Sequence, residues 1–106
     1  MAMEEEGPSP ILIVMTVIPP IMLGLTFVLT DNFSVKPSLP FFFSKILPLV
    51  LLLVATAIAV MGYFTAKDEE PEWGPELPFK VIEALHLAYI AASLILATLV
   101  ILLYFL

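Results

Sequence analysis

The 106-residue chain contains no cysteine and no arginine. Without cysteine it can form no disulfide, no thiolate metal site and no thiol nucleophile, and cysteine usage says nothing about the redox compartment. Arginine is the side chain that best grips phosphate, and a chain that lacks it and carries a net charge of −6 is not expected to bind nucleic acid. Only four glycines are present, and they form no phosphate-binding loop.

Charged residues are also scarce, at 13% of the chain, whereas 61% of the residues are hydrophobic. The apolar residues gather in three stretches, and the first two, residues 11–30 and 46–66, contain no charge at all. The third covers residues 84–106. A helix of about 20 residues crosses a hydrocarbon core of roughly 30 Å. The sequence therefore predicts an all-α integral membrane protein with three transmembrane helices.

The predicted chain is a single membrane domain with two connecting loops. Glu4, Glu5 and Glu6 precede the first span, where a cleavable signal peptide would carry basic residues, so we expect this span to be retained. The predicted segments are an acidic tail (1–10), span one (11–30), a loop (31–45), span two (46–66), an acidic proline-rich loop (67–80) and span three (81–106).

Span one contains two adjacent prolines, Pro19 and Pro20, near its centre. Each removes a backbone donor, and its ring crowds the preceding turn. We expect a kink here, with the carbonyls of Met15 and Thr16 losing their usual partners. A static bend fitted to a neighbouring subunit is the favoured interpretation, and a hinge or a pathway-lining break is the alternative.

Small residues follow one face of span two and one face of span three. Because lipid gives no hydrophobic drive for helix association, close backbone approach at small residues is a common source of attraction. The pattern predicts that spans two and three pack as an antiparallel hairpin. The alternative is that one small face receives a helix of another protein. The predicted packing residues are Ala55, Ala59, Gly62 and Ala66 in span two, and Ala84, Ala88 and Ala92 in span three.

A polar stripe on span three is the one group of residues with potential chemistry. Glu83, His86, Tyr89 and Ser93 share a side of the helix away from its alanines. Such a stripe can relay protons, hold a quinone headgroup or donate one imidazole to a metal or haem. Packing near the headgroups, where Glu83 and His86 cap or pair with one another, is the favoured interpretation. One histidine without cysteine cannot build a transition-metal site alone, so no metal or cofactor is predicted.

The charges of the loops indicate which side of the membrane each loop faces, and only the acids distinguish the two sides. Lys36 and Lys45 balance Lys67 and Lys80 across the membrane, so the positive-inside count is tied. The acidic tail and the acidic second loop share one side, which we expect to be the outer face. Aromatic rings in and beside the second loop, Trp73 and Phe79, are expected at the membrane interface or in a groove of a partner.

Two sets of residues resemble known membrane families. The three-span layout, Lys45 at the head of span two and Met61-Gly62-Tyr63-Phe64 near its end are similar to the small subunit IV of bacterial cytochrome oxidases. The resemblance covers the spans only, and the histidine that those proteins often place near the end of span two is missing. The Pro-Pro pair of span one and the proline-bearing loop that follows it resemble the start of membrane isoprenylcysteine and phospholipid methyltransferases, whose cofactor-binding region is absent here. Neither set assigns the chain to a family.

Catalytic motifs are absent, and three short helices enclose little volume of their own. We therefore expect a non-catalytic accessory subunit of a larger membrane complex, with a respiratory or other energy-converting assembly as the leading candidate. Its expected partners are larger integral membrane subunits and lipids. A homo-oligomeric channel or carrier is the alternative, and a fragment of a methyltransferase-like enzyme ranks last.

Overall fold

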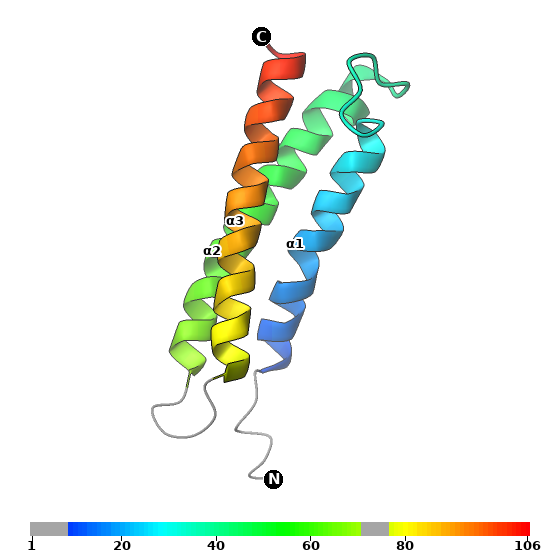
Figure 1. The fold of residues 1–106 in the computed structure, drawn as a ribbon. Coiled ribbons are helices and arrows are strands. Elements are labelled where there is room, and N and C mark those ends of the chain that lie inside the picture. The colour runs from blue at the N-terminus through cyan, green and yellow to red at the C-terminus, as the bar shows by residue number, and fades with distance from the viewer. Residues whose placement is uncertain (1–8, 71–76) are drawn as a thin grey trace.

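The computed structural model describes residues 9–70 and 77–106, which form three long helices (Figure 1). They are α1 (Pro10–Leu29), α2 (Leu47–Glu69) and α3 (Leu77–Tyr104), and a short π-helix, η2 (Phe42–Ile46), leads into α2. Each long helix is apolar enough and long enough to cross a membrane. The predicted all-α membrane fold with three spans is confirmed, and the described residues contain no strand.

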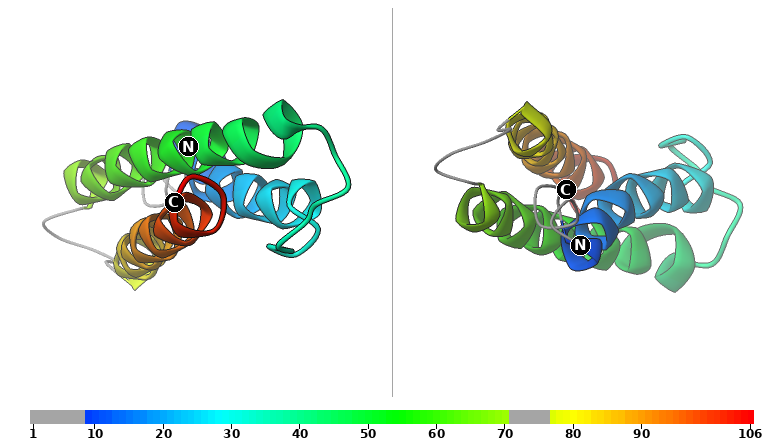
Figure 2. Two further views of the ribbon diagram at one scale, coloured as in Figure 1. Left: turned by 90° about the horizontal axis from the view of Figure 1, so that it is seen from above. Right: turned by 90° about the horizontal axis from the view of Figure 1, so that it is seen from below.

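The helices run up, down and up as a slender bundle whose Cα atoms extend over 53 × 21 × 16 Å. α2 packs along both of the other helices, whereas α1 and α3 contact each other over a shorter stretch (Figure 2). The predicted antiparallel hairpin of α2 and α3 is confirmed. The start of α1, the end of α2 and the start of α3 lie together at one end, opposite the first loop and the carboxyl terminus (Figure 1).

The helices begin and end differently from the predicted spans at three places. The predicted loop 31–45 is too long, because the chain is helical from Phe41 and continues through η2 into α2. Pro48 cannot donate to the carbonyl of Ser44, and the wide π turn lies just before it. α2 continues through Lys67 to Glu69, and α3 starts already at Leu77, with Pro78 tolerated in its first turn.

α1 remains helical through Pro19 and Pro20. Pro19 is buried and Pro20 is exposed. Nearby hydroxyls bond backward along the same helix, because Thr16 donates to the Leu12 carbonyl at 2.8 Å and Thr26 donates to the Met22 carbonyl at 3.0 Å. The bend expected at the proline pair stays a prediction.

α1 ends in an unusual left-handed turn. Asp31, Asn32 and Phe33 all have positive φ, at 52°, 60° and 62°, although none is glycine. The turn is held by hydrogen bonds from the Asn32 N–H to the Phe27 carbonyl at 2.7 Å and from the Phe33 N–H to the Thr30 hydroxyl at 3.0 Å. The edge-to-face contact of the Phe27 and Phe33 rings, with centroids 5.0 Å apart, further stabilises it.

The apolar core consists of two small clusters. Leu12, Ala66 and Phe79 form one where α1 begins, and Leu52, Ala97 and Val100 form the other toward the opposite end. Phe79 is only 1% exposed, so the predicted interfacial position of its ring is wrong: α3 starts before Phe79 and turns the ring into the bundle. The predicted position of Trp73 lies outside the described residues.

Candidate functional site

The predicted small-residue faces are placed very differently. On α2, Ala55, Ala59, Gly62 and Ala66 are all buried. On α3, Ala84 and Ala88 are exposed and Ala92 is half-buried. The side of α3 that packs into the bundle is instead the polar stripe, together with larger apolar residues. α2 and α3 therefore fit small residues against large ones rather than small against small. The buried residues of α3 are Phe79, Glu83, His86, Ser93, Ala97 and Val100.

His86 is fully buried where the three helices meet. Its ring lies over Gly62, and a Cβ built on that glycine would lie only 2.6 Å from the ring Nε2 and 2.7 Å from Nδ1. Across the bundle, Nε2 is 3.0 Å from the Thr16 hydroxyl of α1. The Thr16 hydroxyl also lies 2.8 Å from the Leu12 carbonyl, so this one hydroxyl contacts both its own helix and the imidazole. A single side chain of α3 thus joins α1 and α2.

The other ring nitrogen of His86 is not satisfied in the same way. Nδ1 is buried and makes no hydrogen bond among the described residues, although the Ala59 carbonyl of α2 faces the ring. Tyr89 lies one turn further along α3, half-buried, and its ring contacts the imidazole edge-to-face with centroids 5.4 Å apart. Glu83 and His86, which we expected to cap or pair with one another, have other partners.

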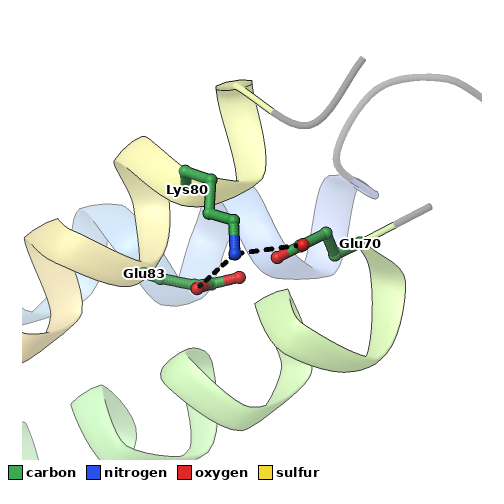
Figure 3. Close-up of polar contacts among 3 residues, drawn as sticks. All are labelled: Glu70, Lys80 and Glu83. Carbon is green, nitrogen blue, oxygen red and sulfur yellow. Dashed lines mark ion pairs between the residues drawn. The ribbon is translucent and has the colours of Figure 1, made fainter. Parts of the chain in front are cut away.

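Glu83 belongs to a charged cluster at the end of the bundle where α2 stops and α3 starts (Figure 3). The Lys80 ammonium lies 3.1 Å from Glu70 Oε2 and 4.0 Å from Glu83 Oε1. The pKa of the Glu70 carboxyl lies below its ordinary value because it accepts a hydrogen bond from the Glu83 carboxyl and pairs with Lys80. Glu83 is only 7% exposed, and its Oε2 has no hydrogen-bond partner within the described segments.

Ser93 completes the stripe two turns beyond His86. It is fully buried, and its hydroxyl makes no hydrogen bond to any described residue. The three buried polar atoms without partners, Glu83 Oε2, His86 Nδ1 and Ser93 Oγ, therefore all come from one side of α3. Because lipid offers no hydrogen bonds, such atoms are an unusual concentration of polarity inside a membrane bundle.

The stripe was predicted from the sequence, but the residues that contact it were not. Thr16 of α1 and Glu70, just after α2, complete the site across the bundle, and no periodicity links them to the stripe. Lys80 lies three residues before Glu83 on α3, a spacing that the sequence does show. Gly62 was predicted as a close helix contact, and the structure places the His86 imidazole over it. The contact between the two helices could have been suspected from the single histidine of α3 and the glycine of α2, both at helix positions that face inward.

The charged cluster at the end of the bundle contains two carboxyls and one ammonium, from Glu70, Glu83 and Lys80. Across residues 9–70 and 77–106, no group of three histidine, cysteine or acidic side chains could bind a metal ion.

At the opposite end of the bundle, the Lys45 ammonium lies over the rings of Phe41 at 5.2 Å and Tyr104 at 5.7 Å, and the Tyr104 hydroxyl donates to the Ser34 carbonyl at 2.6 Å. These contacts anchor the first loop to the end of α3.

Comparisons with known proteins add no relative: no protein family, no curated protein and no solved structure matches this chain.

Proposed function

We propose that this chain is a small accessory subunit of a larger integral membrane complex, with a respiratory or other energy-converting assembly as the leading candidate. The observation that carries the proposal is a row of exposed alanines on α3, Ala84, Ala88 and Ala91. Their spacings of four and three residues keep them on one side of the helix. The small face of α2 is already filled by α3, whereas this row is open to a helix of another subunit.

The placement of the polar groups favours an accessory role over a homo-oligomeric channel or carrier. In the alternative, Pro19-Pro20 and the stripe of Glu83 and His86 line a path between copies of the chain. In the structure, Pro19, Glu83 and His86 are buried inside one protomer. A path between protomers would therefore need other polar groups, and the exposed surfaces of the three helices are dominated by large apolar side chains.

The test is isolation of the full chain, carrying an affinity tag, from its own membrane in mild detergent. We expect larger integral membrane subunits to accompany it, with cofactor absorbance in the case of a respiratory assembly. Ala88→Leu should reduce the recovered partner about tenfold or more, since the added bulk keeps the helices apart and a loss of about 1.4 kcal/mol corresponds to that factor.

Ala57→Leu is the matched control, because Ala57 is an exposed alanine on α2 outside the row. It should leave recovery of the partner unchanged. The proposal fails if the chain runs as a discrete homo-oligomer with no other subunit, or if Ala57→Leu reduces recovery as much as Ala88→Leu does.

A further inference from the structure

The charged cluster of Glu70, Lys80 and Glu83 becomes more buried from the surface inward. The Lys80 side chain is 51% exposed, that of Glu70 19% and that of Glu83 9%. The one ammonium lies closer to Glu70 than to Glu83, at 3.1 Å against 4.0 Å. The inner carboxyl is therefore both the most buried of the three groups and the less well paired.

The surroundings of Glu83 stabilise an ionised carboxylate poorly. An ionised carboxyl in a buried position needs donors for both oxygens, and its Oε2 has none among the described residues. Figure 3 shows the Glu83 carboxyl directed toward that of Glu70, with Lys80 alongside. Two negative carboxylates that both lie within 4.0 Å of the same ammonium repel one another. A proton on the inner one converts the repulsion into a hydrogen bond to Glu70.

We propose that Glu70 and Glu83 form a proton-binding site at this end of the bundle, in which the two carboxyls share one proton and exchange it with the adjacent aqueous phase. A hydronium ion gives its proton to a Glu83 carboxylate oxygen, where the new O–H bond forms, and it leaves as water. No electron moves. Glu70 stays ionised, paired with Lys80 and accepting the hydrogen bond from Glu83.

The other charged and titratable groups of the described chain leave this pair isolated. Lys67 of α2 acts on both carboxyls through space and, like Lys80, favours their ionised forms. Glu69 is turned toward α1, where the Ser9 hydroxyl and N–H donate to its two oxygens at 2.6 Å and 3.0 Å. His86, one turn deeper on α3, is bonded to Thr16. The proton is therefore shared between Glu70 and Glu83 alone.

The site differs from the proposed accessory role and does not depend on it. It is built from this chain alone, so it must function in the isolated protein whether or not a partner exists. Glu83 lies between the aqueous end of the bundle and His86, which is one turn further in on α3. A proton on Glu83 therefore lies inside the protein, which is the position expected at the entrance of a proton path.

The experiment is infrared titration of the full chain in lipid nanodiscs, following the stretching band of protonated carboxyl groups as the pH is changed. As the pH is lowered, we expect one carboxyl to become protonated ahead of the others, with a band that is shifted in D₂O and absent in Glu83→Gln. Glu70→Gln removes the like charge and replaces the carboxylate acceptor by a neutral amide oxygen, which is a weaker acceptor. The midpoint of the Glu83 titration should then fall by about one pH unit or more.

Glu69→Gln is the matched control, because it makes the same chemical change one residue away in a carboxyl that is bound by Ser9. It should move the midpoint much less than Glu70→Gln does. The proposal is overturned if no carboxyl becomes protonated ahead of the others, if this band persists in Glu83→Gln, or if Glu69→Gln and Glu70→Gln shift the midpoint equally. If Glu83→Gln does not fold, the difference between the midpoints of Glu70→Gln and Glu69→Gln still tests the proposal.

Discussion

At the scale of single residues, the bundle depends on a fit between one histidine and one glycine. The His86 ring occupies the space that a side chain at Gly62 would take, and it reaches through to the Thr16 hydroxyl of α1. Small residues in membrane helices usually let two backbones approach. Here the small residue admits a polar ring, so the same glycine positions the group of α3 that hydrogen-bonds across to Thr16 of α1.

Gly62→Ala should therefore destabilise the bundle, although alanine is the better helix former. The new Cβ would overlap the imidazole, and displacing the ring should cost about 1–3 kcal/mol as overpacking and weaken its bond to Thr16. Gly24→Ala is the control, since nothing lies within 4 Å of a Cβ there. It should raise stability by up to about 1 kcal/mol. Unfolding by sodium dodecyl sulfate from lipid–detergent micelles measures both.

A double substitution identifies the ring as the cause. In a His86→Ala background the clash is absent, so adding Gly62→Ala should cost far less than it does in the parent chain. Purely additive effects of the two substitutions would show that Gly62 is needed for backbone approach and not for His86.

At the scale of whole helices, the sequence predicted which segments are helical better than it predicted which sides they pack. Length and apolar content locate three spans because the membrane imposes both. The predicted bounds erred where charges or prolines begin, at Lys67 and Pro78, since helices can continue into the headgroup region. α3 has 28 residues and so measures about 42 Å, well beyond a hydrocarbon core of roughly 30 Å.

The packing side of α3 could not be read from residue size alone. A rule that pairs small residues selects Ala84 and Ala88, which are exposed, over Glu83 and His86, which are buried. The buried side is chosen by complementarity: α2 offers a row of small residues, and larger groups of α3 fill it. The partners of the buried polar groups include Thr16 and Glu70, whose positions beside α3 follow only from the folded arrangement.

Leu52→Ala measures how much the thin apolar core contributes. Leu52 is fully buried against Ala97 and Val100, whereas its neighbour Leu53 is 55% exposed. Losing the Leu52 side chain should destabilise the bundle by roughly 2 kcal/mol through lost packing. Leu53→Ala should change stability little, because lipid replaces the missing contacts. Equal effects in the same denaturation assay would mean that the Leu52 cluster adds nothing beyond lipid contact.

At the scale of the whole molecule, the two ends of the bundle differ in chemistry. One end brings together the start of α1, the end of α2 and the start of α3, with Ser9 bonded to Glu69 and Lys80 paired with Glu70 (Figure 1). The other end is closed by aromatic rings around Lys45 and by the bond from Tyr104 to Ser34. The alternation of loops and spans predicted this separation, whereas the contacts that fasten each end were not predicted.

The separation gives a direct test of topology and orientation. Because the chain has no cysteine, single substitutions report without background, and Lys36 and Asp68 are exposed at opposite ends. The tail and the second loop carry eight acids, against Asp31 alone in the first loop, so we expect their side to be the outer face. An impermeant maleimide applied to intact cells should then label Asp68→Cys and leave Lys36→Cys unlabelled until the membrane is opened. The reverse pattern would mean that the orientation is inverted. It would still agree with the fold, because one span lies between the two sites and places them on opposite sides of the membrane. Labelling of both sites in intact cells would contradict the three-span topology itself. The acids of the tail and the second loop are Glu4, Glu5, Glu6, Asp68, Glu69, Glu70, Glu72 and Glu76.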